Sequence, residues 1–202
     1  IVGVDIENHR GITNPQLDIT EIRQRKTVCP STTGGINWNS IAYSPQTNAL
    51  YAPTNNVCMD YYLNPVNPTV GGYHSSAVSR KISVPDGDEQ IGIFSAVEVA
   101  SGKTLWTYKQ RAAITGSVLT TGGGLAFVTD DARRFRAFDV DNGSILWEQV
   151  LNSSAGGFPS TYSVDGEQYV AIAAGGGVSH RALTPEIQQR RGGNMLFVFK
   201  LP

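Results

Sequence analysis

Two glycines followed closely by Asn37 and Trp38 form the segment of this chain best suited to contact a ligand. A Gly-Gly pair lets the backbone take positive φ or approach another group closely. The Trp38 indole offers a flat apolar face with one N–H donor. The same pattern also fits a core tryptophan behind a turn, because tryptophan is usually buried. Alternation over residues 38–43 predicts that this segment runs into a strand.

Other residues capable of chemistry are scattered along the chain. The three histidines have no ligand spacing, and they are His9, His74 and His180. The acidic residues gather in two short clusters, Asp130-Asp131 and Asp86, Asp88 and Glu89. Carboxylate oxygens suit calcium or a lanthanide, but turns of this composition predict solvated loops rather than a metal site.

Composition limits the class of protein. The chain has 202 residues, 40% apolar and 16% charged, with a net charge of −1. That balance argues against nucleic-acid binding. No run of 18 apolar residues predicts a transmembrane helix, and no signal peptide is visible. The first residues, from Ile1, have a strand-like pattern, which suggests a fragment or a processed chain.

Glycine, proline, asparagine, threonine and serine are frequent, and there are 22 glycines. Good helix-forming stretches are nearly absent, so the composition predicts an all-β fold with many turns. The only cysteines are Cys29 and Cys58. Two cysteines alone cannot make a structural zinc site, which leaves free thiols or one disulfide.

An internal repeat decides the fold class. FSAVEVASGKTLW (residues 94–106) and FRAFDVDNGSILW (residues 135–147) share Phe, Ala, Val, Gly, Leu and Trp at the same offset of 41 residues. Each copy predicts a β-hairpin, because an alternating strand leads to a glycine turn and a second strand. Each is preceded by another strand pair, so a unit contains four strands in about 40 residues, which indicates a β-propeller blade.

The blades divide the chain as follows. Residues 1–18 hold the outer strands of a preceding blade, 34–110 form a blade with an insertion near 56–90, 114–151 form a regular blade, and 155–202 form the last blade. Propellers need roughly 4 to 8 blades to close. The remaining blades must therefore come from an N-terminal part of the propeller, a second chain or a symmetric copy.

The repeat resembles the tryptophan-docking repeat of the pyrroloquinoline quinone (PQQ) dependent alcohol dehydrogenases, which are quinoproteins built as propellers. Ala137-Phe138-Asp139 through Gly143 to Trp147 fits fully, and Ala96 to Trp106 fits with Glu98 for Asp. VCPSTTGGINWNSIAYSP and the closing LFVFKLP are also similar to this family. The resemblance covers nearly the whole chain but only the C-terminal part of such an enzyme. It implies about three of eight four-stranded blades.

The resemblance assigns roles to particular residues. Asn37 and Trp38 are expected to face PQQ, with amide donors and an aromatic face. Ser117 and Val118 are a further expected contact, although Thr115 stands where the family often has tryptophan. Two tryptophans, Trp106 and Trp147, are expected to pack between blades.

The resemblance also implies a Cys29–Cys58 disulfide and hence a periplasmic or secreted location. The expected metal is calcium or a lanthanide, with ligands in the missing N-terminal part, and no residue here is expected to ligate metal or to act as the catalytic base. The expected partners are a small alcohol and a periplasmic electron acceptor such as a cytochrome c. The function implied is therefore part of an alcohol dehydrogenase, inactive alone. The alternative is a non-catalytic propeller-type scaffold or binding module.

Overall fold

The computed structural model describes residues 2–75, 77–85, 87–176, 180–187 and 193–201. Apart from one 3-10 turn, Pro15–Leu17, the regular elements of this part of the chain are strands. The strands are β1 (Gly3–Asp5), β2 (Arg10–Ile12), β3 (Lys26–Val28), β4 (Ala42–Ser44), β5 (Ala49–Asn55), β6 (Cys58–Leu63), β7 (Ala77–Ser83), β8 (Gly92–Glu98), β9 (Thr104–Gln110), β10 (Leu119–Thr120), β11 (Leu125–Thr129), β12 (Arg134–Asp139), β13 (Ile145–Val150), β14 (Ser160–Val164), β15 (Glu167–Ala174) and β16 (Met195–Lys200).

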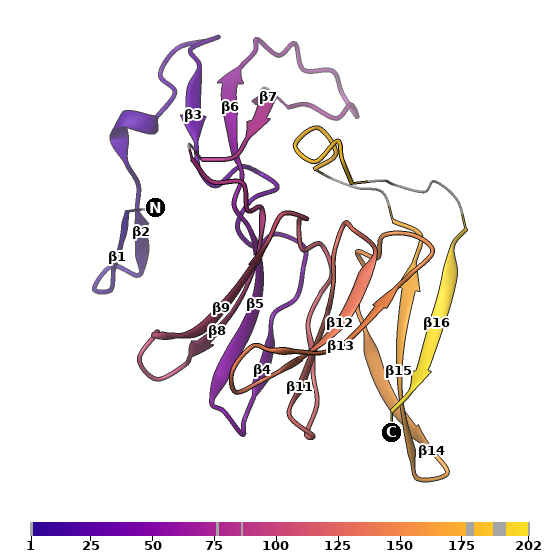
Figure 1. The fold of residues 1–202 in the computed structure, drawn as a ribbon. Helices are drawn as coiled ribbons and strands as arrows, with labels where there is room; N and C mark the ends of the chain where they lie inside the picture. Colours follow the sequence, from indigo (N-terminus) through magenta and orange to yellow (C-terminus); the bar gives the residue numbers. More distant parts are fainter. Residues whose placement is uncertain (1, 76, 86, 177–179, 188–192, 202) are drawn as a thin grey trace.

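Three antiparallel sheets stand side by side in chain order (Figure 1). The first sheet has the order β4-β5-β8-β9 and the second β10-β11-β12-β13, so both have the four strands expected of a blade. The third sheet has the order β14-β15-β16, one strand fewer than a full blade among the described residues. Asp165 and Gly166 join β14 to β15 with φ of 51° and 80°, as expected of a tight Asp-Gly hairpin turn.

The two copies of the repeat have the same hairpin geometry. Gly102 and Gly143 take φ of 70° and 73°, a conformation that glycine adopts without steric cost. Each of these glycines donates its N–H to the last residue of the preceding strand, at 2.9 Å in both cases. A bulge lies at the same place in each hairpin, after Ala96 in one and after Ala137 in the other. The repeat therefore specifies turn, register and bulge together.

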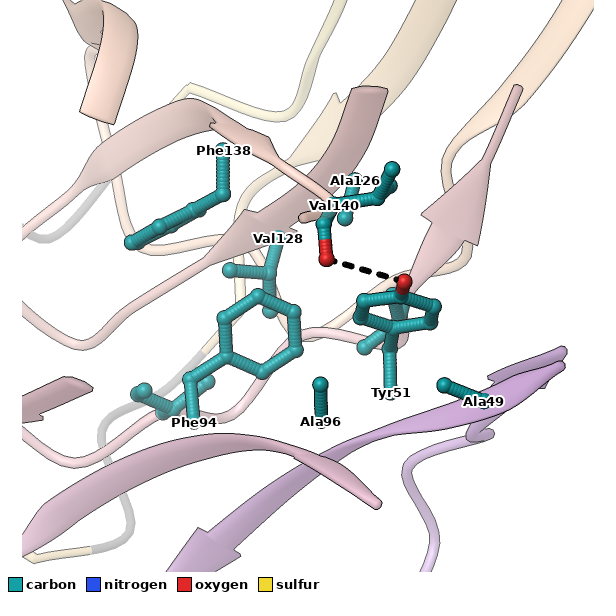
Figure 2. Close-up of a cluster of buried hydrophobic side chains, with 10 residues drawn as sticks. Ala49, Tyr51, Phe94, Ala96, Ala126, Val128, Phe138 and Val140 are labelled. Carbon is teal, nitrogen blue, oxygen red and sulfur yellow. Dashed lines mark hydrogen bonds between the residues drawn. The ribbon is translucent and has the colours of Figure 1, made fainter. Parts of the chain in front are cut away.

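Buried apolar side chains hold the first sheet against the second (Figure 2). Tyr51 and Phe94 of the first sheet are fully buried against Phe138 and Val140 of the second. The Tyr51 hydroxyl donates to the Val140 carbonyl at 3.0 Å, so its polar atom is satisfied inside the core. A second cluster, which includes Phe135, joins the second sheet to the third.

Trp106, on the outer strand β9, packs against the next sheet along the chain. Its indole N–H donates to the Val140 carbonyl at 2.8 Å. A Cβ on Gly143 would lie 2.6 Å from the Trp106 ring, so only glycine permits this contact. Trp147 occupies the matching position on β13, and it packs edge-on against Phe135 and Phe199.

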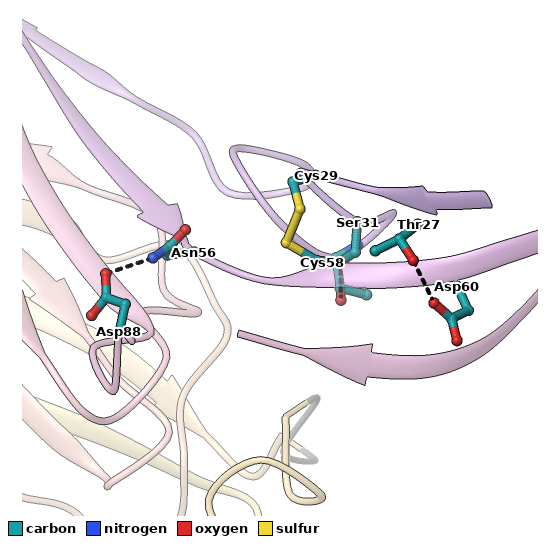
Figure 3. The surroundings of a disulfide bond; sticks show 8 residues. Thr27, Cys29, Ser31, Asn56, Cys58, Asp60 and Asp88 are labelled. Carbon is teal, nitrogen blue, oxygen red and sulfur yellow. Dashed lines mark hydrogen bonds between the residues drawn. A yellow bond between two sulfur atoms is a disulfide. The ribbon is translucent and has the colours of Figure 1, made fainter. Parts of the chain in front are cut away.

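An additional sheet, β3-β6-β7, pairs β3 with the two strands of the long connection between β5 and β8. The disulfide Cys29–Cys58, with a Cα–Cα distance of 4.4 Å, joins the residue after β3 to the first residue of β6 (Figure 3). The Ser31 N–H donates to the Val57 carbonyl at 2.7 Å beside it. This disulfide is the arrangement that the family resemblance implied for the two cysteines.

The strand predicted over residues 38–43 is shorter than expected, because β4 begins only at Ala42. Asn39 and Ser40 bond to the next sheet instead of extending the ladder with β5: the Asn39 amide donates to the Gly116 carbonyl at 3.1 Å. In the described part of the chain, no helix has the length and apolar character needed to cross a bilayer.

Candidate functional site

Three connections lead into the first strands of the three sheets, and we call them the entry segments: residues 34–41, 113–118 and 153–159. They lie in a row joined by hydrogen bonds. The Ser40 N–H donates to Ser117 Oγ at 2.9 Å, and the Val118 N–H donates to the Ser40 carbonyl at 3.0 Å. The Ser117 N–H donates to the Gly157 carbonyl at 3.2 Å. The row places the sequence-predicted site residues at one end of the sheet array.

The glycines of the first entry segment have structural explanations. A Cβ on Gly34 would lie 2.6 Å from the Val57 carbonyl oxygen, and Gly35 has φ of 62°. These glycines therefore allow a tight turn beside the disulfide-linked strand. What the turn presents to solvent is the pair that follows, Asn37 and Trp38.

Trp38 is 85% exposed. The alternative interpretation of the sequence, a core tryptophan behind a turn, is therefore wrong for Trp38. Asn37 is exposed as well, and its side-chain amide donates to the Thr32 carbonyl at 2.6 Å. That bond fixes the side chain and uses one of its two N–H groups, so one N–H and the amide oxygen remain for a ligand.

Ser117 and Val118, the further contact expected from the sequence, are buried, unlike Asn37 and Trp38. They are 2% and 7% exposed. The Ser117 hydroxyl accepts the Ser40 N–H, and Val118 belongs to the core between the first and second sheets. These contacts indicate that Ser117 and Val118 support the first entry segment.

The third entry segment was not singled out in the sequence, although it repeats the position of the other two. Gly156 and Gly157 line a hollow of about 560 Å³ together with Gly175, Gly176 and Asn194. The following residue, Phe158, is 66% exposed. The sequence signal for the third entry segment is the glycine pair Gly156-Gly157, which precedes a strand as the pair at residues 34–35 does.

The acidic pair Asp130-Asp131 corrects the sequence analysis, which expected a solvated turn. The two residues are 1% and 0% exposed. Arg136, itself 5% exposed, donates to Asp130 Oδ2 at 2.8 Å, and Gln110 donates to the same oxygen at 3.0 Å. Glu148 accepts from Arg136 at 2.6 Å on the other side. Asp130 therefore belongs to an ion network that links β9, β12 and β13, buried at Asp130 and Arg136 and exposed at Glu148.

Asp131 has a different environment. Its Oδ1 accepts from the Thr115 hydroxyl at 3.0 Å, and its N–H donates to the Ala113 carbonyl at 2.9 Å. Its Oδ2 has no hydrogen-bond partner among the described residues and lies 3.9 Å from His180 Nδ1. Burial raises the pKa of Asp131 to about 7, against the opposing effect of the Thr115 hydrogen bond.

His180 reaches this place from the connection between β15 and β16. It is 2% exposed, and burial lowers its pKa. Its Nε2 lies 3.2 Å from Thr33 Oγ1, just before the first entry segment. The other histidines, His9 and His74, do not join it. Within the described ranges no three His, Cys, Asp or Glu side chains form a group able to hold a metal. Of the second acidic cluster, Asp86 lies outside the described residues, and Asp88 accepts from Asn56.

Comparisons with known proteins agree with this architecture. The family model described as "PQQ: Glucose/ethanol/alcohol dehydrogenase, beta-propeller domain" matches residues 88–170. A lanthanide-dependent methanol dehydrogenase of Methylacidiphilum fumariolicum is 34% identical over 85% of this chain and 28% of its own length. A 1-butanol dehydrogenase (quinone) of Thauera butanivorans is 35% identical over 87% of this chain and 28% of its own length.

Solved structures give the same result. A europium-containing methanol dehydrogenase superposes with a TM-score of 0.86 and 28% identity, over 98% of this chain and 38% of its own chain. A quinohemoprotein alcohol dehydrogenase from Pseudomonas putida HK5 superposes with a TM-score of 0.76 and 26% identity, over 98% of this chain and 31% of its own. The chain thus spans about 28% of the length of the curated relatives named above and forms part of a β-propeller. It belongs to the family of PQQ-dependent quinoprotein alcohol dehydrogenases.

Proposed function

We propose that this chain forms one side of a PQQ site and contributes, together with the rest of a propeller, to the oxidation of an alcohol. The observation that carries the proposal is the exposed pair Asn37 and Trp38 on the row of entry segments. A large aromatic side chain that is 85% exposed adds nothing to packing within the chain. A ring held at such a place is suited to cover a planar ligand.

The chain's own residues fit such a ligand. Trp38 supplies an aromatic face, and Asn37 supplies an N–H and an oxygen fixed by the bond to Thr32. Gly156 and Gly157 leave the third entry segment open, so that backbone can approach a ligand closely. Ser117 supports the first entry segment by accepting the Ser40 N–H. A bound PQQ would supply the hydride acceptor for alcohol oxidation, and Asn37 and Trp38 would hold and orient it.

The rest of the propeller is needed for this activity. Among the described residues the third sheet ends at β16 after three strands, whereas β9 and β13 are the fourth strands of the other two sheets. Trp106 is covered by the Gly143 turn, whereas Trp147 borders a hollow of about 560 Å³ lined by Leu146, Lys200 and other side chains. We infer that an N-terminal part of the propeller or a second chain supplies the missing strands and the general base.

The remaining roles follow from the same proposal. The disulfide Cys29–Cys58 supports a periplasmic or secreted location, since disulfides persist in oxidising compartments. A calcium or lanthanide ion is expected beside PQQ, held by residues of the complementary part. Relatives named as methanol dehydrogenase (cytochrome c) subunit 1 suggest a cytochrome c as electron acceptor. A small alcohol is the expected substrate.

The test is reconstitution. The natural polypeptide or complex that contains this chain is freed of cofactor, then supplied with PQQ and either calcium or a lanthanide, with an artificial dye as acceptor. The proposal predicts alcohol-dependent dye reduction and saturable PQQ binding. A well-folded assembly that neither binds PQQ nor reduces dye would instead support the alternative, a non-catalytic scaffold or binding module.

A further inference from the structure

A chain of four side chains links three distant parts of the molecule at the roots of the entry segments. Thr33 precedes the first entry segment, Thr115 lies within the second, Asp131 lies in the β11–β12 turn, and His180 comes from the β15–β16 connection. The contacts are Thr33 Oγ1 to His180 Nε2 at 3.2 Å, and Thr115 Oγ1 to Asp131 Oδ1 at 3.0 Å. Asp131 Oδ2 and His180 Nδ1 face each other at 3.9 Å.

The two central members of this chain are sealed from water. Asp131 is 0% and His180 2% exposed. A buried carboxylate oxygen without a hydrogen bond is costly, and Asp131 Oδ2 has none among the described residues. A proton on Asp131 removes the charge and provides a donor directed toward His180, which a neutral imidazole nitrogen can accept.

Charged groups on the surrounding elements are already engaged elsewhere. Asp130, on the same turn, binds Arg136. Arg133 donates to the Leu151 carbonyl, and Arg111 pairs with Glu186 at 2.7 Å. Arg181, next to His180, is exposed. Of the nearby charges, Asp130 still acts on Asp131 and raises its pKa, while the His180 backbone opposes this.

We propose that Asp131 and His180 are positioning residues that clamp the first two entry segments to the β15–β16 connection. The clamp fixes Thr33 and Thr115, and through them the turn that presents Asn37 and Trp38. The consequence for ligand binding rests on the proposed function, whereas the clamp itself does not. None of the four members touches the proposed ligand-facing groups directly, so they act by holding backbone in place.

Hydrogen–deuterium exchange in the natural polypeptide tests the clamp without any cofactor. Peptides covering residues 33–41 and 113–120 report on the Ser40 and Val118 N–H bonds between the segments. In Asp131→Asn and His180→Gln we expect exchange in both peptides at least about tenfold faster than in the unmodified protein. A peptide covering the Gly143 turn serves as the internal reference and should not change.

The pH dependence separates a clamp from simple packing. Because Asp131 loses its proton as the pH rises through about 7, protection of both peptides should fall there in the unmodified protein. The Asp131→Asn variant should lack this step. Unchanged exchange in both variants, or the same pH step in Asp131→Asn, would overturn the proposal.

A milder pair of variants covers the case in which these fail to fold. Thr115→Val removes one hydroxyl of the clamp, and Thr121→Val, directly after β10, is its control. The proposal requires faster exchange over residues 113–120 in Thr115→Val alone. Equal behaviour of the two variants would contradict it. PQQ titration of the same proteins distinguishes the clamp from the proposed function. If exchange is faster in Thr115→Val but the unmodified protein does not bind PQQ, the clamp is supported and the proposed function is contradicted.

Discussion

The buried pair Asp131 and His180 predicts opposite pH dependences of stability in two single variants. The folded-state pKa of Asp131 is raised to about 7 from 3.8, and that of His180 is lowered from 6.5. Burial thus favours the protonated form of Asp131 and the neutral form of His180. The two shifts have opposite effects on the slope of stability against pH, so they oppose each other in the unmodified pair.

Removing one partner exposes the contribution of the other. In His180→Gln, Asp131 is protonated in the folded state below about 7 but in the unfolded state only below 3.8. Its stabilisation is present at low pH, and the free energy of unfolding should fall by about 1.4 kcal/mol per unit as the pH rises from 4 to 7, or about 4 kcal/mol in total.

In Asp131→Asn the sign is reversed. His180 resists protonation when folded, so stabilisation present above pH 6.5 is lost as the pH falls, by up to about 1.4 kcal/mol per unit. Denaturant titrations of the three proteins at pH 4.5, 5.5, 6.5 and 7.5 measure these slopes, and other titrating groups cancel in the differences. Parallel curves for all three proteins would refute the assignment of a shared, buried proton to this pair.

Two further predictions concern the framework. Gly143→Ala should destabilise the protein by about 1 to 3 kcal/mol more than Gly102→Ala. Both glycines have positive φ, but only a Cβ on Gly143 would meet the Trp106 ring, at 2.6 Å. Thermal unfolding of the two variants therefore isolates that contact, and equal losses of stability would argue against it. Removing the disulfide in Cys29→Ser/Cys58→Ser should lower the free energy of unfolding by about 3 to 4 kcal/mol, as the loop-entropy model implies for a 29-residue separation. Denaturant titration of the unmodified protein with and without reductant measures the same loss. Equal free energies of unfolding in the two conditions would contradict this prediction.

The hairpins could be predicted because their information is local. The glycine of each turn, the alternation before it and the tryptophan after it all lie within thirteen residues, as in FRAFDVDNGSILW. The structure confirms both hairpins down to the bulge after Ala96 and Ala137. Family resemblance added the disulfide, which spacing alone left open.

The errors arose where distant segments meet. An Asp-Asp turn has the composition of a solvated loop, and only contacts with Arg136, Gln110 and His180 bury it. The strand expected from residue 38 is cut short because Ser40 bonds to Ser117, 77 residues away. The third entry segment, at Gly156 and Gly157, was missed because its role depends on alignment with the other two. Such pairings are set by the stacking of the sheets, which no local pattern records.

On the proposed function, Trp38 serves to contact a ligand and not to pack within the chain. The most direct measurement compares Trp38→Ala with Trp106→Ala in the natural polypeptide, by PQQ titration and thermal unfolding. Because Trp38 is 85% exposed, its loss should change stability by no more than about 0.5 kcal/mol while weakening PQQ binding at least about tenfold. Trp106→Ala should cost about 3 to 5 kcal/mol of stability. Unchanged PQQ affinity in a folded Trp38→Ala protein would contradict the account.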